Sequence, residues 1–145
     1  MDYKNLSIIE LKEIIYNQQF QRFPYLKEFK KNPYSYLKGR YYMFCSIYLV
    51  YFFLKTRITP NMVTVAYCFC GVIGSILLSI PNYYLNILGV FVFFNKSILD
   101  WSDGHLARIK YKATLTGHIL DVYGGVLNSI GLTVGLGFFA FNQSS

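Results

Sequence analysis

Hydrophobic and polar positions are distributed unevenly along this chain. Up to residue 40 charged and apolar residues are mixed, whereas beyond it apolar residues dominate and charges gather mainly at residues 55–61 and 100–112. A soluble protein spreads its charges so that each element keeps a polar face. The pattern therefore predicts a small polar headpiece over residues 1–40, followed by membrane-embedded helices.

The headpiece pattern predicts one short amphipathic helix. Ser7 and Glu10 have the spacing of a helix-capping box. Ile8, Leu11 and Ile15 then recur at helical intervals, so one face of the segment is apolar. Two prolines predict turns after this helix: Pro24 and Pro33.

Four apolar stretches follow the headpiece. A helix over residues 41–54 would be about 21 Å long, short of the roughly 30 Å hydrocarbon core, and basic residues lie at both of its ends. These features predict an amphipathic helix that lies in the membrane interface and does not span the membrane. With its basic flank, this interfacial segment covers residues 41–57. The next three stretches are predicted transmembrane helices: residues 62–80, 83–99 and 116–141.

The basic residues predict how these helices are oriented. Lysines and arginines lie in the flanks at residues 55–61 and 105–112, whereas the Pro81–Asn82 turn has none. By the positive-inside rule both flanks and the headpiece face the cytosol. The predicted fold is thus all-α and integral to the membrane, with a cytosolic headpiece, an interfacial helix and a core of three spans over residues 58–145.

The composition agrees with this class of protein. Hydrophobic residues make up 54% of the chain and charged residues only 14%, against about 25% in soluble domains. The net charge of +7 comes from basic residues beside apolar runs, which indicates the lipid bilayer with its anionic headgroups as their partner and not nucleic acid. Three cysteines are too few for a disulfide framework.

Three of the seven acidic residues lie within the apolar part, at Asp100, Asp103 and Asp121. A carboxylate inside a membrane helix costs about 2.5–3.5 kcal/mol, so it indicates a function. Asp100 and Asp103 share one helical face on which Gly104 leaves a gap, and Asp121 follows another glycine by one turn on the next span. Carboxylate oxygens are ligands that Mg²⁺ and Mn²⁺ prefer, and nearby Arg108 indicates a phosphate or pyrophosphate ligand.

A purely structural explanation of these carboxylates is also open. Asp100 and Asp103 are close enough in sequence to pair with Lys96 and Arg108 at a solvated helix end. Such an arrangement leaves Asp121 unexplained.

The same residues resemble a known family signature. CDP-alcohol phosphatidyltransferases carry D-x-x-D-G-x-x-A-R, then eight residues, then G-x-x-x-D-x-x-x-D. Seven of the eight fixed positions match here with the spacing intact: Asp100, Asp103, Gly104, Ala107, Arg108, Gly117 and Asp121. The run Thr59-Pro60-Asn61 is similar to one that opens the first span in many members, and the resemblance extends over about residues 35–141.

The resemblance implies an integral membrane enzyme of six spans, often dimeric, that acts in the synthesis of phospholipids or related polar lipids. Such an enzyme transfers a phospho-alcohol group from a CDP-linked alcohol donor to a hydroxyl acceptor and releases CMP. By this resemblance Asp100, Asp103 and Asp121 would bind the metal, Mg²⁺ or Mn²⁺. The pocket for CMP and pyrophosphate would be formed by five residues: Asp100, Gly104, Ala107, Arg108 and Gly117.

The chain departs from the family pattern at two points. The last aspartate of the signature, which in the family deprotonates the acceptor hydroxyl, falls on Gly125. His118 is a candidate substitute base, although it lies to the side of the helical face that carries Asp121. Three predicted spans are half of the family's six, so a second copy or a C-terminal half would complete the bundle.

The alternative to an active phosphotransferase is therefore a truncated, catalytically impaired relative. Such a protein would still bind metal and cytidine nucleotide, or would assemble as a helical membrane protein without activity.

Overall fold

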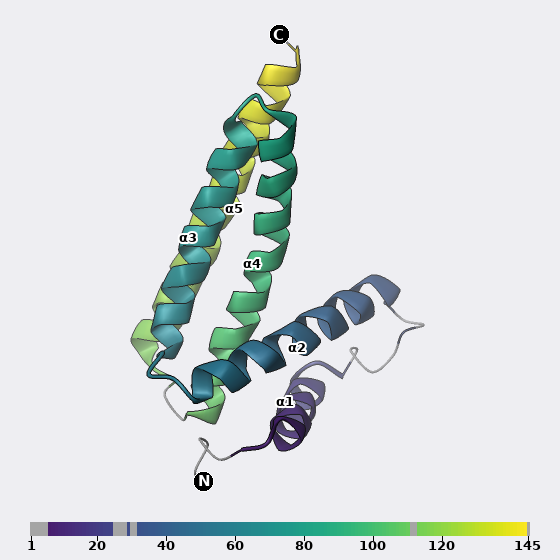
Figure 1. Ribbon diagram of the computed structural model, residues 1–145, viewed down its shortest axis with the longest axis vertical. Helices are drawn as coiled ribbons and strands as arrows, with labels where there is room; N and C mark the ends of the chain where they lie inside the picture. The colour runs from purple at the N-terminus through teal and green to yellow at the C-terminus, as the bar shows by residue number, and fades with distance from the viewer. Residues whose placement is uncertain (1–5, 25–28, 30–31, 111–112, 145) are drawn as a thin grey trace. The chain divides into compact units, whose positions relative to one another are not determined.

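The computed structural model describes residues 6–24, 29, 32–110 and 113–144, and it is all-helical (Figure 1). Its five helices are α1 (Ile8–Arg22), α2 (Pro33–Leu54), α3 (Pro60–Ser79), α4 (Tyr83–Ile109) and α5 (Leu115–Ser144). The predicted all-α class is confirmed.

The chain forms two compact units, and α4 contributes to both. The first unit contains residues 1–60 and 101–112, hence α1, α2 and the C-terminal end of α4. The second contains residues 61–100 and 113–145, hence nearly all of α3, most of α4, and α5. The motif on α4 is therefore divided between the two units at Asp100.

The predicted amphipathic helix of the headpiece is confirmed as α1. The Ser7 backbone N–H donates to Glu10 Oε2 at 2.9 Å, and the Glu10 N–H donates to Ser7 Oγ at 3.3 Å, which completes the capping box. Leu11 and Ile15 are fully buried, and α1 packs against α2. The apolar face predicted from the spacing is thus the face that forms the interior of the first unit.

Arg40 of α2 lies among aromatic rings of the first unit. Its guanidinium carbon is 5.3 Å from the ring centroid of Tyr16, 5.0 Å from that of Phe20 and 5.2 Å from that of Tyr36. A guanidinium is weakly hydrated and stacks well on aromatic faces. Because two of these rings belong to α1 and one to α2, Arg40 joins the two helices.

We expect Arg40→Leu to weaken the attachment of α1 by about 1–2 kcal/mol, since it removes the cation and keeps most of the volume. Limited proteolysis of the detergent-solubilised protein should then cut within residues 8–32 several times faster than in wild type. Lys38→Gln is the matched control, because the Lys38 ammonium lies over Tyr34 and Tyr42 of its own helix. Equal cleavage rates for Arg40→Leu and wild type would contradict the expectation.

Helix α2 begins earlier than the apolar pattern indicates. The prediction of a turn at Pro33 is wrong, because Pro33 is the first residue of a helix of 22 residues. Proline is tolerated there since its missing N–H would have no partner within the helix anyway. Asn32 caps the helix by accepting a hydrogen bond from the Ser35 N–H at 3.1 Å.

The predicted boundary at residue 40 falls inside α2, and the division of the chain at residues 40 and 57 stays a prediction. At 22 residues α2 is about 33 Å long, so its length no longer argues against a span. Its position in the membrane interface also stays a prediction.

The end of α2 is fixed by the end of α4 within the first unit. Lys110 Nζ donates to the carbonyl oxygens of Phe53, at 3.2 Å, and Ile58, at 2.8 Å. The Phe53 carbonyl is at the C-terminus of α2, where carbonyls carry partial negative charge that a lysine stabilises, and the Ile58 carbonyl is in the connection to α3. The rings of Tyr42 and Trp101 add an aromatic contact, with centroids 5.8 Å apart.

Small residues allow the three long helices of the second unit to approach closely (Figure 1). A Cβ on Gly89 of α4 would lie 3.0 Å from the Gly74 carbonyl oxygen of α3. A Cβ on Gly135 of α5 would lie 2.8 Å from the Ser75 carbonyl oxygen, also of α3. Close approach at small residues is how helices associate in lipid, where no hydrophobic force drives them together.

Two of the described helices are long and apolar enough to cross a membrane, α3 and α5. They correspond to two of the three predicted spans. Helix α4 does not join them, since Asn86, Asn95 and Lys96 lower the mean hydropathy of its first part. A transmembrane α4 stays a prediction, and so does the cytosolic orientation. Within the basic flank at residues 105–112, residues 111–112 lie outside the described part.

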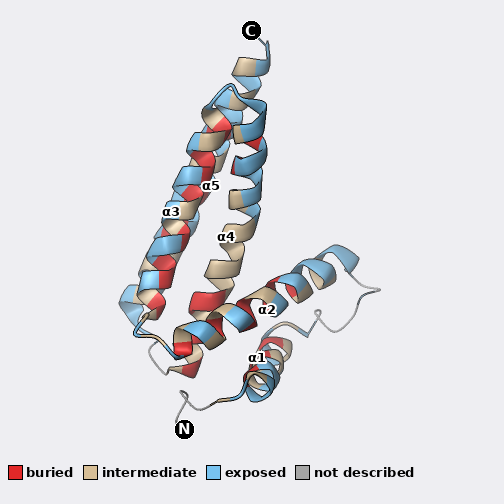
Figure 2. Ribbon diagram, viewed as in Figure 1, coloured by how far each residue is buried: buried red, intermediate tan, exposed pale blue. Residues whose placement is uncertain are grey.

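Many residues of α5 are exposed (Figure 2), and large apolar residues are among them. They include Val122, Val126, Ile130, Val134 and Phe138. Such a surface is stable only against lipid or other apolar helices.

Candidate functional site

The first half of the predicted motif lies on the C-terminal half of α4. Asp100, Asp103, Gly104 and Ala107 occupy positions i, i+3, i+4 and i+7 of one continuous helix, so they share a face. Asp103 is buried, with 7% of its surface exposed. Asp100 belongs to the second unit, whereas the residues from Asp103 to Arg108 belong to the first.

Within the second unit, the structure brings Asp100 of α4 and Asp121 of α5 together. Their side chains are within hydrogen-bonding reach, and the Lys96 ammonium is near enough for its charge to act on Asp100. Tyr67 of α3 donates from its hydroxyl to the Asp121 backbone carbonyl at 3.0 Å. Two carboxylates within hydrogen-bonding reach repel each other when both are ionised, so they must share a proton or a cation.

Lys96 connects this pair to α3. Its ammonium lies 5.4 Å from the Tyr67 ring centroid and 4.7 Å from that of Phe93. The lysine next to Asp100 that the purely structural explanation requires is therefore present. That explanation does not account for the approach of a second carboxylate, Asp121.

Within the first unit, Arg108 lies against its own helix. Its Nη2 donates to Nδ1 of His105 at 2.9 Å. A Cβ on Gly104 would lie 3.4 Å from Arg108 Nη1, so the guanidinium lies over the gap that the glycine leaves. The Asp103 carboxylate is near enough for its charge to favour the guanidinium cation.

His105 is a residue that the sequence did not single out. It is fully buried, and its Nε2 has no hydrogen-bond partner among the described residues. The Nε of Arg108 is also buried and has no hydrogen-bond partner among the described residues. The spacing of three residues between His105 and Arg108 was the available sequence signal, since side chains at i and i+3 are neighbours on a helix.

Burial lowers the pKa of His105 to about 3, and the charges of Arg108 and Arg22 act in the same direction. An unfolded chain binds a proton on histidine near pH 6.5. The neutral ring therefore contributes its full stability above about pH 7, and this contribution is lost as the pH falls from 6.5 toward 3.

We expect the free energy of unfolding to fall by about 2 kcal/mol between pH 7 and pH 5 on account of His105 alone. Thermal unfolding of the detergent-solubilised protein at both pH values measures the fall. In His105→Leu the fall should be smaller by that amount. An identical fall in the variant and the wild type would show that His105 takes up its proton as readily in the folded chain as in the unfolded chain.

The second half of the motif begins at the N-terminus of α5. The Gly117 N–H donates to Thr114 Oγ1 at 3.0 Å. A Cβ on Gly117 would lie 2.8 Å from Asn61 Oδ1, so the glycine allows Asn61 to come close. Asn61 is the last residue of the Thr59-Pro60-Asn61 run, so that residue and Gly117 of the signature meet within the second unit.

The position of the absent aspartate is open. A Cβ on Gly125 would have one neighbour, the Tyr67 hydroxyl at 3.9 Å, which is ordinary van der Waals contact. The chain therefore lacks the carboxylate at position 125 but keeps the space for it. His118 is exposed, and its role as a substitute base stays a prediction.

Asn128 shares the face of Asp121 but turns toward α3. It is buried, and its side chain occupies the space that Gly71 leaves, since a Cβ on Gly71 would overlap it. This contact between an asparagine and a glycine is typical of closely packed membrane helices. The packing gives Asn128 a structural role between α3 and α5.

The oxygen atoms of the three motif aspartates are the type of ligand that a hard divalent cation binds. Among the described residues no group of three or more histidine, cysteine, aspartate or glutamate side chains is placed to hold a metal ion. The described structure brings together two carboxylates, Asp100 and Asp121, and the third, Asp103, lies one turn further along α4 in the other unit. Oxygen ligands of this kind suit Mg²⁺ or Mn²⁺.

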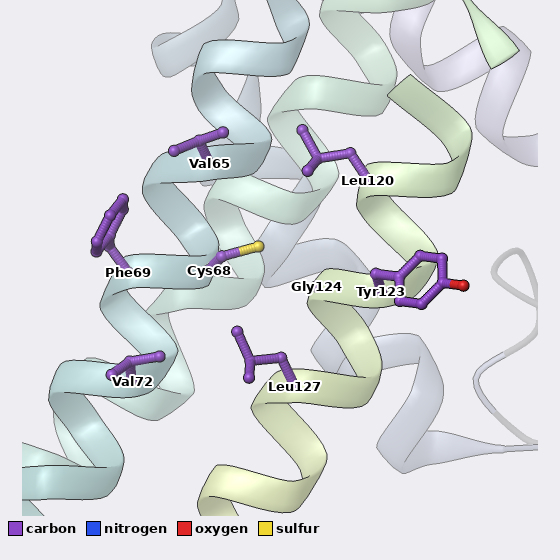
Figure 3. Close-up of a pocket in the computed structure, with 8 residues that line it drawn as sticks. All are labelled: Val65, Cys68, Phe69, Val72, Leu120, Tyr123, Gly124 and Leu127. Carbon is purple, nitrogen blue, oxygen red and sulfur yellow. The ribbon is translucent and has the colours of Figure 1, made fainter. Parts of the chain in front are cut away.

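An apolar groove of about 420 Å³ lies between α3 and α5 (Figure 3). Its lining residues are Val65, Cys68, Phe69, Val72, Leu120, Tyr123, Gly124 and Leu127. In Figure 3, Leu120 and Leu127 extend from α5 on either side of Gly124. A phosphate would have no charged partner there, so the groove is not the nucleotide site.

These observations define a helical protein with two helices able to cross a membrane, an acidic pair in its second unit and a buried histidine–arginine contact in its first. The family model described as CDP-alcohol phosphatidyltransferase matches residues 57–142, which is more than half of the chain. The chain therefore belongs to the CDP-alcohol phosphatidyltransferase family. The match begins at residue 57, so the expected resemblance over residues 35–56 is not part of it. No curated protein and no solved structure matches the chain.

Proposed function

We propose that this chain is a metal-dependent CDP-alcohol phosphotransferase that acts at the cytosolic face of a membrane. It would transfer a phospho-alcohol group from a CDP-linked donor to a hydroxyl acceptor, in the synthesis of phospholipids or related polar lipids. The observation that carries the proposal is the approach of Asp100 and Asp121 from separate helices of a family member. Two ionised carboxylates repel each other, so the pair must share a proton or a cation, and in a member of this family we take it to be a cation.

Each residue of the motif would have a distinct task. Asp100, Asp103 and Asp121 would hold Mg²⁺ or Mn²⁺, which would neutralise charge on phosphorus and on departing CMP. Arg108 would donate hydrogen bonds to phosphate oxygens. By the family resemblance, the pocket would be completed by positions with little or no side chain: Gly104, Ala107 and Gly117. The Arg108 guanidinium lies beside Gly104 and the Asn61 side chain beside Gly117, so both would border the nucleotide.

The transfer forms a bond between the acceptor oxygen and phosphorus and breaks the bond between phosphorus and the CMP oxygen. The acceptor hydroxyl must lose a proton in the process. Its usual recipient in the family is absent at Gly125, so in this chain the proton would go to water or to His118.

A catalytically impaired relative is the second candidate function, and the observation that favours it is Gly125. Removal of a general base lowers rates by about 10²–10⁴. Such a protein would retain metal and cytidine nucleotide binding while turning over slowly or not at all. A purely structural helical membrane protein is the third, and the exposed apolar surface of α5 favours it.

Release of CMP separates the first candidate from the others. Purified protein in detergent is incubated with Mn²⁺ and a panel of CDP-alcohols, and CMP is quantified with and without EDTA. Metal-dependent release supports the enzyme. No release, together with Mn²⁺-dependent binding of CMP, supports the impaired relative.

We expect Asp103→Ala to weaken CMP binding in the presence of Mn²⁺ by at least about 10-fold, because it removes a metal ligand. Isothermal titration of the two proteins measures the difference. Glu13→Ala is the control, since Glu13 is an exposed carboxylate of the headpiece outside the capping box. Equal binding by Asp103→Ala and wild type, or no binding by either, would leave only the structural candidate.

A further inference from the structure

The guanidinium of Arg108 is held by two neighbours on its own helix. Gly104, four residues earlier, leaves the space in which Nη1 lies, and His105, three residues earlier, accepts a hydrogen bond from Nη2 at 2.9 Å. Arginine has several rotatable bonds, and an exposed arginine samples many rotamers. These contacts select one direction for the side chain.

The hydrogen bond determines the tautomer of His105. A guanidinium has donors and no acceptor, so Nδ1 of His105 must accept and the proton of the neutral ring must be on Nε2. The ring is packed against Trp101, with centroids 6.2 Å apart, and it is fully buried. The imidazole is therefore rigid and presents its lone pair to Arg108.

Packing does not explain a histidine at this position. Its Nε2–H is buried without a partner among the described residues, which costs about 1–3 kcal/mol. A leucine fills a similar volume and has no polar group to leave unsatisfied. What histidine provides and leucine does not is the acceptor for Arg108.

Arg108 has donors that its hydrogen bond to His105 does not use. Its Nε is buried and has no hydrogen-bond partner among the described residues. Arg22 of α1 adds a second positive charge that acts on both Arg108 and His105. The Asp103 carboxylate also acts on Arg108, so two cationic side chains and one anionic side chain surround the oriented N–H groups. Oriented N–H groups on a guanidinium are the chemistry that binds a phosphate.

We propose that His105 is a positioning residue that holds the Arg108 guanidinium in the orientation that binds a phosphate group of the cytidine nucleotide. This inference rests on the proposed function and deepens it. The signature leaves position 105 unspecified, so the role belongs to this chain's own structure.

The test compares two substitutions in the complete chain, with CMP and Mn²⁺ as the probe. His105→Leu removes the acceptor and should raise the Kd for CMP by about 10-fold, because an oriented charge-assisted hydrogen bond is lost. His105→Asn places an amide oxygen close to the position of Nδ1, so its Kd should stay within about threefold of wild type. Without nucleotide, His105→Leu should melt at or above the wild-type temperature at pH 7.5, since no N–H is left unsatisfied.

A double-mutant cycle separates positioning from packing. In an Arg108→Leu background, His105→Leu should have no further effect on the Kd. The same 10-fold loss in both backgrounds would overturn the inference, because His105 would then act without Arg108. A ¹⁵N NMR spectrum of the histidine ring adds a direct readout, and a proton on Nδ1 in place of Nε2 would also overturn it.

The outcomes distinguish this inference from the proposed function. CMP binding by the wild type that His105→Leu leaves unchanged would overturn the positioning role alone. No CMP binding by the wild type at any Mn²⁺ concentration would overturn the proposed function and the inference with it.

Discussion

Gly125→Asp is expected to raise the rate of CMP release by about 10²–10⁴ over the wild-type chain. The substitution restores the carboxylate that the family uses to deprotonate the acceptor. The structure has room for it, because the new Cβ would meet one atom, the Tyr67 hydroxyl at 3.9 Å. Position 125 lies one helical turn beyond Asp121, so the added carboxylate would lie on the same face of α5 as the Asp121 carboxylate.

The measurement is CMP released per minute from a CDP-alcohol donor, with Mn²⁺ and each candidate acceptor. Gly125→Asn is the matched control, because asparagine has nearly the same shape and can ligate a metal but cannot take up a proton. A gain in Gly125→Asp and none in Gly125→Asn would assign the gain to the base. If both variants release CMP no faster than wild type, the missing carboxylate is not what limits turnover.

The helices of this chain are well predicted from sequence where the apolar pattern is long. The amphipathic α1 and the apolar α3 and α5 follow from periodicity and composition, since each has a face or a length that only a helix satisfies. The start of α2 differs from the prediction because a proline can begin a helix as well as break one, and here Asn32 and Pro33 together begin it. Local capping chemistry decides that boundary, and hydrophobicity does not.

The candidate site is only partly predictable from sequence. The spacing of Asp100, Gly104 and Arg108 is enough to place them on a shared face of one helix. The approach of Asp100 to Asp121 depends on how α4 and α5 pack, and residue spacing alone cannot supply that distance. Tyr67, whose hydroxyl binds the Asp121 carbonyl, is 54 residues away and has no sequence signal at all.

Asp121→Asn is expected to abolish Mn²⁺-dependent CMP binding, with the Kd raised by at least about 100-fold. Removal of a residue that only supports a metal ligand costs about 10–100-fold in affinity, so loss of a ligand itself should reach or exceed that range. Asparagine keeps the shape of the side chain and leaves the backbone carbonyl that Tyr67 binds unchanged. The packing of α3 against α5 should therefore survive the substitution.

Stability without metal should move in the opposite direction to binding. Asp100 and Asp121 repel each other when both are ionised, so replacing one by a neutral amide removes an unfavourable interaction from the metal-free protein. We expect Asp121→Asn to melt at or above the wild-type temperature in EDTA, and to lose the rise in melting temperature that Mn²⁺ gives the wild type. A variant that melts lower in EDTA would mean that the pair stabilises the fold by sharing a proton. A rise with Mn²⁺ equal to that of wild type would mean that the metal binds elsewhere.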